Sequence, residues 1–104
     1  MKIEELSPNL VWKNFYAITQ IPHPSGHLEK ISDFIVDFSK KLHLQTEIDE
    51  IGNILIRKPA TKGKENSPSI VLQAHLDMVP QKNNHIKHNF ETDPLNVFID
   101  GDWV

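Results

Sequence analysis

Cysteine is absent from this chain of 104 residues, and so are long hydrophobic runs and any excess of positive charge. Without cysteine, disulfide bonds and thiolate zinc sites are excluded, so a metal would have to be bound by histidine and carboxylate side chains. The same absence fits a reducing compartment. No segment approaches the roughly 20 apolar residues of a membrane-spanning helix, and the acidic N-terminus lacks the apolar stretch of a signal peptide. We therefore expect a cytoplasmic protein with no membrane partner.

The charge balance excludes a second class of partner. The formal net charge is -3, which argues against a nucleic-acid-binding protein because such proteins usually carry a basic patch. Only four glycines are present, and none forms a glycine-rich phosphate loop. No nucleophile arrangement of serine, histidine and aspartate is visible either. A composition of 38% hydrophobic and 24% charged residues is ordinary for one globular domain.

Two amphipathic helices are predicted in the first half of the chain. Ser7 is a favourable N-cap with Pro8 at the first helical position, and this helix should stop before the two prolines that follow Ile21. Ser25 is the expected cap of the second helix, whose apolar stripe runs over residues 28–42 at three- and four-residue steps.

Strands are predicted in the remainder. Residues 44–49 alternate in polarity and residues 54–58 return after a tight turn at Gly52-Asn53, which is typical of a hairpin. Residues 69–74 do not alternate, which indicates a strand buried on both faces. A further strand is expected at 96–99, with a loop at Asp100-Gly101 and a return strand from Asp102. We expect an α/β fold in which two N-terminal helices pack on a mixed sheet.

A histidine and an aspartate follow the apolar strand 69–74. Side chains at positions i and i+2 of a strand point to the same face, so His75 and Asp77 are expected side by side. Asp77 could orient the imidazole of His75, or the two could share a metal site. An isolated His-x-Asp pair is more often structural, but its place at the end of a buried strand favours a functional site.

The other histidines carry weaker interpretations. A simple metal-binding protein that uses His75, His85 and His88 is one alternative, although solvated loop histidines are the more common case. Between its two prolines, His23 could face a cleft and contact a substrate. The remaining two, His27 and His43, are expected on helix surfaces.

Several long blocks together carry a family resemblance. Residues 21–25, 52–61, 71–83 and 99–104 closely resemble the bacterial aminoacyl-histidine dipeptidases, which belong to a group of zinc-dependent exopeptidases and deacylases. The likeness extends over the whole chain and is much more specific than the His-x-Asp pair alone. It implies a two-zinc α/β catalytic domain with a smaller lid domain, and hydrolysis of Xaa-His dipeptides by a metal-activated water.

The resemblance also implies roles for the two site residues. His75 matches the first metal-ligand histidine of the family, and Asp77 matches the aspartate that orients it and is counted with the catalytic residues. The other ligands, the general-base glutamate and the lid domain have no counterpart here. Residues 1–104 are therefore expected to be an incomplete N-terminal part of the catalytic domain, inactive alone.

One alternative function stays open beside the peptidase. The chain could be a non-catalytic, truncated module that associates through exposed sheet edges, because unpaired edges readily add a partner strand. A homo-oligomer is possible under this interpretation.

Overall fold

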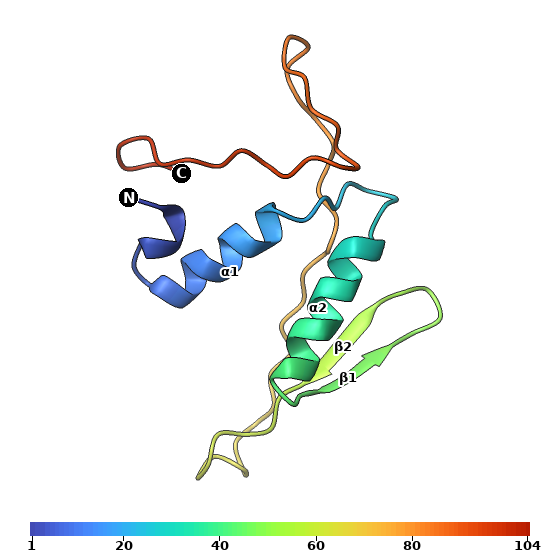
Figure 1. Cartoon of the computed structure of the whole chain (residues 1–104). Helices are drawn as coiled ribbons and strands as arrows, with labels where there is room; N and C mark the ends of the chain where they lie inside the picture. The colour runs from blue at the N-terminus through green and yellow to red at the C-terminus, as the bar shows by residue number, and fades with distance from the viewer. The chain divides into compact units, whose positions relative to one another are not determined.

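The computed structural model describes all 104 residues, which divide into two compact units. One unit contains residues 1–31 and 77–104, and the other contains residues 32–76. Figure 1 shows the elements in chain order. They are η1 (Ile3–Glu5), α1 (Asn9–Thr19), α2 (Glu29–Lys41), β1 (Gln45–Ile48) and β2 (Ile54–Arg57). Helices and strands occur together, as the α/β prediction requires. Neither helix is long and apolar enough to cross a membrane.

Helix α1 begins one residue later than predicted. Pro8 occupies the N-cap position and its carbonyl accepts the first backbone bonds of the helix. Ser7 makes no side-chain cap, and its carbonyl instead accepts a hydrogen bond from Trp12 Nε1 at 3.2 Å. The helix ends at Thr19, before the prolines, as predicted.

Helix α2 begins at Glu29, so the predicted cap at Ser25 is wrong. The C-terminal end closes in a Schellman arrangement: the N–H of His43 donates to the carbonyl of Lys40 at 2.9 Å, and that of Leu44 to Ser39 at 3.0 Å. His43 has a φ of 58°, the left-handed conformation that usually favours glycine. It lies beyond the helix, and its predicted place on a helix surface is also wrong.

Strands β1 and β2 form the predicted antiparallel hairpin, with Thr46 opposite Ile56 and Ile48 opposite Ile54. The connection is longer than the predicted two-residue turn. The carboxylate of Asp49 accepts bonds from the backbone N–H of Ile51 at 3.0 Å and of Asn53 at 2.8 Å. It also accepts a bond from the Asn53 side-chain amide at 2.8 Å. The carboxylate thus closes the loop, because it accepts hydrogen bonds from backbone N–H groups. In a tighter turn these groups would bond to backbone carbonyls.

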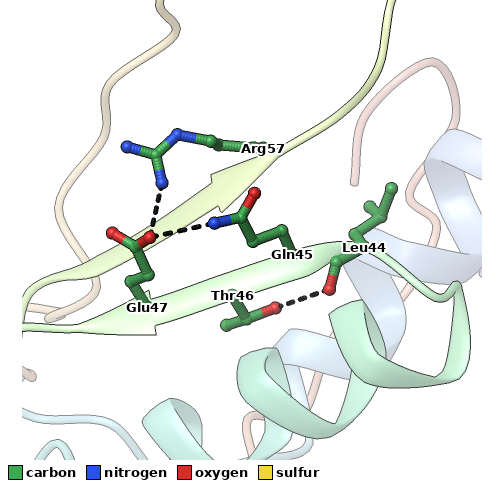
Figure 2. Close-up of polar contacts among 5 residues, drawn as sticks. All are labelled: Leu44, Gln45, Thr46, Glu47 and Arg57. Carbon is green, nitrogen blue, oxygen red and sulfur yellow. Dashed lines mark hydrogen bonds and ion pairs between the residues drawn. The ribbon is translucent and has the colours of Figure 1, made fainter.

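One face of the hairpin carries a polar cluster. Glu47 Oε1 accepts hydrogen bonds from Arg57 Nη1 at 2.6 Å and from Gln45 Nε2 at 3.0 Å, as Figure 2 shows. Both partners of the Glu47–Arg57 ion pair are about half exposed. Such pairs contribute at most about 1 kcal/mol because water screens them, so this cluster sets register more than stability.

A hydroxyl pair links the hairpin to α2. Ser39 is only 1% exposed, and its Oγ lies 2.6 Å from Oγ1 of Thr46. The same Ser39 hydroxyl reaches the Val36 carbonyl at 2.9 Å, and Thr46 donates to the Leu44 carbonyl at 3.1 Å, a bond visible in Figure 2. The buried hydroxyl of Ser39 and the half-buried hydroxyl of Thr46 therefore each have a partner, as polar groups removed from water require.

The predicted buried strand at 69–74 is absent. No strand pairs with this segment among the 104 residues. Ile70, Val71 and Leu72 are 82%, 86% and 89% exposed, because nothing in the described chain covers them. The expected mixed sheet is therefore wrong as well: the sheet has two antiparallel strands, and the one parallel contact is an isolated bridge between Pro24 and Met78.

The C-terminal strand at 96–99 does not form, but a turn follows it. Asp100 and Trp103 exchange backbone hydrogen bonds of 2.8 and 3.0 Å around Gly101, whose φ is 60°. The turn lies one residue later than the predicted Asp100-Gly101 loop. The pairing of Asp100 with Trp103 is an isolated bridge and does not extend into two strands.

The early and late parts of the first unit also meet away from this turn. The N–H of Leu95 donates to the Thr19 carbonyl at 2.9 Å. Two side chains contact Glu91. His27 Nε2 lies 3.2 Å from its carboxylate, and Lys30 Nζ donates a hydrogen bond to its backbone carbonyl at 3.0 Å. These contacts hold the return segment along the end of α1 and the start of α2.

The exposed apolar segment predicts self-association of the 104-residue chain. We expect Val71→Lys to reduce the associated fraction in light scattering, because a charge in an exposed apolar segment opposes its pairing with a second chain. Asn66→Lys adds the same charge in the polar loop nearby and serves as the control. Equal scattering from both variants would contradict this role of the segment.

The loop carboxylate predicts acid sensitivity of the hairpin. The Asn53 amide, followed by backbone N–H groups, lowers the pKa of Asp49 below its usual value. A lowered folded-state pKa stabilises the fold above the unfolded value, about 3.9, and this contribution is lost as pH falls through the folded pKa. Asp49→Asn should therefore lower the unfolding midpoint at pH 6 more than at pH 3. Asp33→Asn removes an exposed carboxylate of α2 and is the control. Its effect on the unfolding midpoint should be the same at pH 6 and at pH 3.

Candidate active site

The site is built on a turn that follows the two prolines. The N–H of His27 donates to the Pro24 carbonyl at 2.9 Å, which closes a four-residue turn over Ser25 and Gly26. Gly26 has a φ of 86°, the left-handed region that the third residue of such a turn can require. Pro24 is buried, whereas Ser25 is exposed. The turn therefore has a buried proline at its start and an exposed serine after it.

A short parallel bridge attaches this turn to the segment that follows His75. The N–H of Met78 donates to the His23 carbonyl at 2.9 Å, and the N–H of Ser25 donates to the Met78 carbonyl at 3.1 Å. These two backbone bonds involve the residues before and after Pro24. They hold Met78, and with it the preceding Asp77, beside the turn.

The side chain of Asp77 is bound by the same turn. Ser25 Oγ donates to Asp77 Oδ2 at 2.5 Å, across 52 residues of chain. Asp77 is half-buried. The sequence analysis does not predict this contact, because it expects Ser25 to cap a helix. No periodic or local signal connects the two residues, so only the shared resemblance of residues 21–25 and 71–83 to one family could have grouped them.

His75 lies at the end of the extended segment and is exposed. Its unit ends at Leu76, and Asp77 is the first residue of the return segment of the other unit. The roles assigned to the pair, ligand and orienting carboxylate, stay predictions.

The remaining histidines are placed separately. Nδ1 of His23 lies 2.6 Å from the Ile21 carbonyl, and His27 pairs with Glu91 as described above. The ring of His88 packs edge-on against Phe90, with centroids 4.7 Å apart, beside a hollow of about 320 Å³. The predicted substrate contact through His23 stays a prediction.

The histidine and carboxylate side chains of this chain do not form a metal site by themselves. No group of three or more histidine, aspartate and glutamate side chains among the 104 residues is arranged to hold an ion. Tight zinc sites use three or four protein ligands, so these residues alone do not fit a zinc pair. The same finding argues against the alternative site of His75, His85 and His88.

Two known proteins are similar to this chain over almost its whole length. No protein-family model matches the chain. It is 52% identical over 103 residues to the cytosol non-specific dipeptidase of Escherichia coli (strain K12), a match that covers 99% of this chain. The chain also matches the crystal structure of aminoacylhistidine dipeptidase from Vibrio alginolyticus with a TM-score of 0.95 and 46% identity, again over 99% of its length.

The chain is similar to these dipeptidases over almost its whole length. Identity near one half over nearly every residue, together with the shared fold, confirms the predicted resemblance. The chain spans 21% of the length of each of these dipeptidases. Ser25, His75 and Asp77 thus lie in a chain that aligns with dipeptidases almost from end to end.

The positive φ of Gly26 predicts a distinctive effect of substitution. Gly26→Ala should cost about 1–2 kcal/mol of backbone strain and loosen the turn, which we expect to speed amide hydrogen exchange at Ser25 and Met78. Gly63, in an exposed loop, has the same φ of 86°, and a Cβ at either position meets no atom within 4 Å. Gly63→Ala is therefore the matched control: similar strain, but unchanged exchange at the bridge. Faster exchange in both variants would contradict the assignment.

Proposed function

We propose that residues 1–104 form the opening portion of the catalytic domain of a metal-dependent dipeptidase. The observation that carries this proposal is the 52% identity to the Escherichia coli dipeptidase over 99% of the chain. The match to the Vibrio alginolyticus structure, with a TM-score of 0.95, agrees with it.

The proposed substrates are dipeptides that end in histidine, cleaved at their single peptide bond. The names of the two similar proteins differ on this point: one is called a non-specific dipeptidase and the other an aminoacylhistidine dipeptidase. A panel of dipeptides with a constant first residue and histidine, leucine or glycine in the second position separates the two preferences. Higher kcat/KM for the histidine peptide supports the narrower proposal.

His75 is proposed to supply one ligand to a zinc pair, with Asp77 orienting its imidazole. Residues at i and i+2 of an extended segment face the same side, which suits a carboxylate that holds the ligand's ring. One histidine is far from a complete ligand set. We therefore propose that the other ligands and the general base come from residues outside 1–104. Residues 1–104 alone are accordingly proposed to be inactive.

The cytoplasm is the proposed location. The support is the word cytosol in the name of the Escherichia coli relative.

The alternative of a non-catalytic module has its own support in the exposed, unpaired segment around Val71 and in the two-stranded sheet with open edges. Such edges add strands from partners. A folded homo-oligomer without dipeptidase activity in the complete gene product would favour this function over the peptidase.

The role of His75 gives the decisive test. In the complete gene product, His75→Ala should lower dipeptide hydrolysis by more than about a hundredfold, because loss of a ligand exceeds the 10–100-fold effect of losing a residue that only supports one. Treatment with a chelator should abolish activity, and added zinc should restore it. His85→Ala, at an exposed loop histidine, is the control and should retain activity. Full activity of the His75 variant would refute the assignment.

A further inference from the structure

Ser25 has no structural duty of the kind predicted for it. Helix α2 starts four residues later, at Glu29, so the hydroxyl caps no helix. The residue is exposed, so burial does not force its hydroxyl to find a protein partner. Its Oγ nevertheless lies 2.5 Å from Asp77 Oδ2. That distance belongs to the 2.5–2.7 Å range of hydroxyl–carboxylate bonds, which are about twice as strong as bonds between neutral groups.

The hydroxyl is also not needed to join the two segments. The backbone bonds from Met78 to His23 and from Ser25 to Met78 already connect them. The turn closed by His27 and Pro24 fixes the main chain from which the hydroxyl projects. The donor is therefore held in place before it meets the carboxylate, which is the condition for precise orientation.

We infer that Ser25 is a positioning residue for Asp77. The carboxylate of Asp77 changes direction by rotation about two bonds, Cα–Cβ and Cβ–Cγ. When Ser25 holds Oδ2, both rotations are restricted and the direction of Oδ1 follows from the geometry of the turn. The inference rests on the proposed dipeptidase function, in which Asp77 must present its carboxylate to His75 in one orientation.

The test uses a matched pair of variants in the complete gene product. Ser25→Thr retains the hydroxyl, and Ser25→Val has nearly the same shape without it; both keep the backbone N–H that binds Met78. We expect Ser25→Val to lower kcat up to about tenfold, the low end of the range for residues that orient a ligand, because Ser25 acts on the ligand only through Asp77, and we expect little change in KM. Ser25→Thr should restore most of kcat. A merely structural role of residue 25 would affect both variants alike.

A second measurement does not depend on activity. The side-chain carboxyl carbon of Asp77, observed by NMR after isotopic labelling of aspartate, should shift at constant pH in Ser25→Val and remain near its original position in Ser25→Thr. An unchanged signal in the valine variant, unchanged kcat in that variant, or equal losses in both variants would overturn the inference.

Failure of the proposed function gives a different pattern. In that case the unsubstituted protein does not hydrolyse dipeptides, or His75→Ala remains fully active. The carbon signal then decides alone: a shift confined to Ser25→Val supports the hold of Ser25 on Asp77, and no shift overturns it.

Discussion

The backbone bridge between His23–Ser25 and Met78 is the contact on which the candidate site depends. It joins segments about 50 residues apart, and closing a loop of that length costs about 3.5 kcal/mol in chain entropy. Three hydrogen bonds, two from the bridge and one from the Ser25 hydroxyl, contribute about 0.5–1.5 kcal/mol each. The bridge is therefore close to balanced by itself. The contacts of Leu95 with Thr19 and of Glu91 with His27 and Lys30 supply the remaining attachment.

Local polar contacts, rather than a large apolar core, define the elements around this bridge. Ile3 and Ile31 are the buried large apolar side chains, whereas most others keep substantial contact with water. Boundaries are set by short-range bonds: the Schellman arrangement at His43 ends α2, and the Asp49 carboxylate closes the hairpin. Such contacts specify where an element stops but add little to its stability, since exposed hydrogen bonds exchange with water.

Short-range patterns in the sequence predicted the elements that short-range forces build. The hairpin, the end of α1 and the apolar stripe of α2 were all readable from spacing and turn residues. The strand predicted at 69–74 does not form, because its burial requires neighbours that these residues do not provide. The site divides in the same way. His75 and Asp77 could be named from the sequence and its resemblance, but the bond between Ser25 and Asp77 spans 52 residues, and no local rule reaches that far.

The order of the two units along the chain has a consequence for synthesis. Residues 32–76 are complete before Asp77 and Met78 leave the ribosome, and their hairpin pairs residues only about ten positions apart. Contacts of such short range form quickly. The flanking unit must wait for its second segment, so the growing chain presents a formed hairpin first. The turn at Ser25 then receives its carboxylate partner only after the residues of the hairpin have been synthesised.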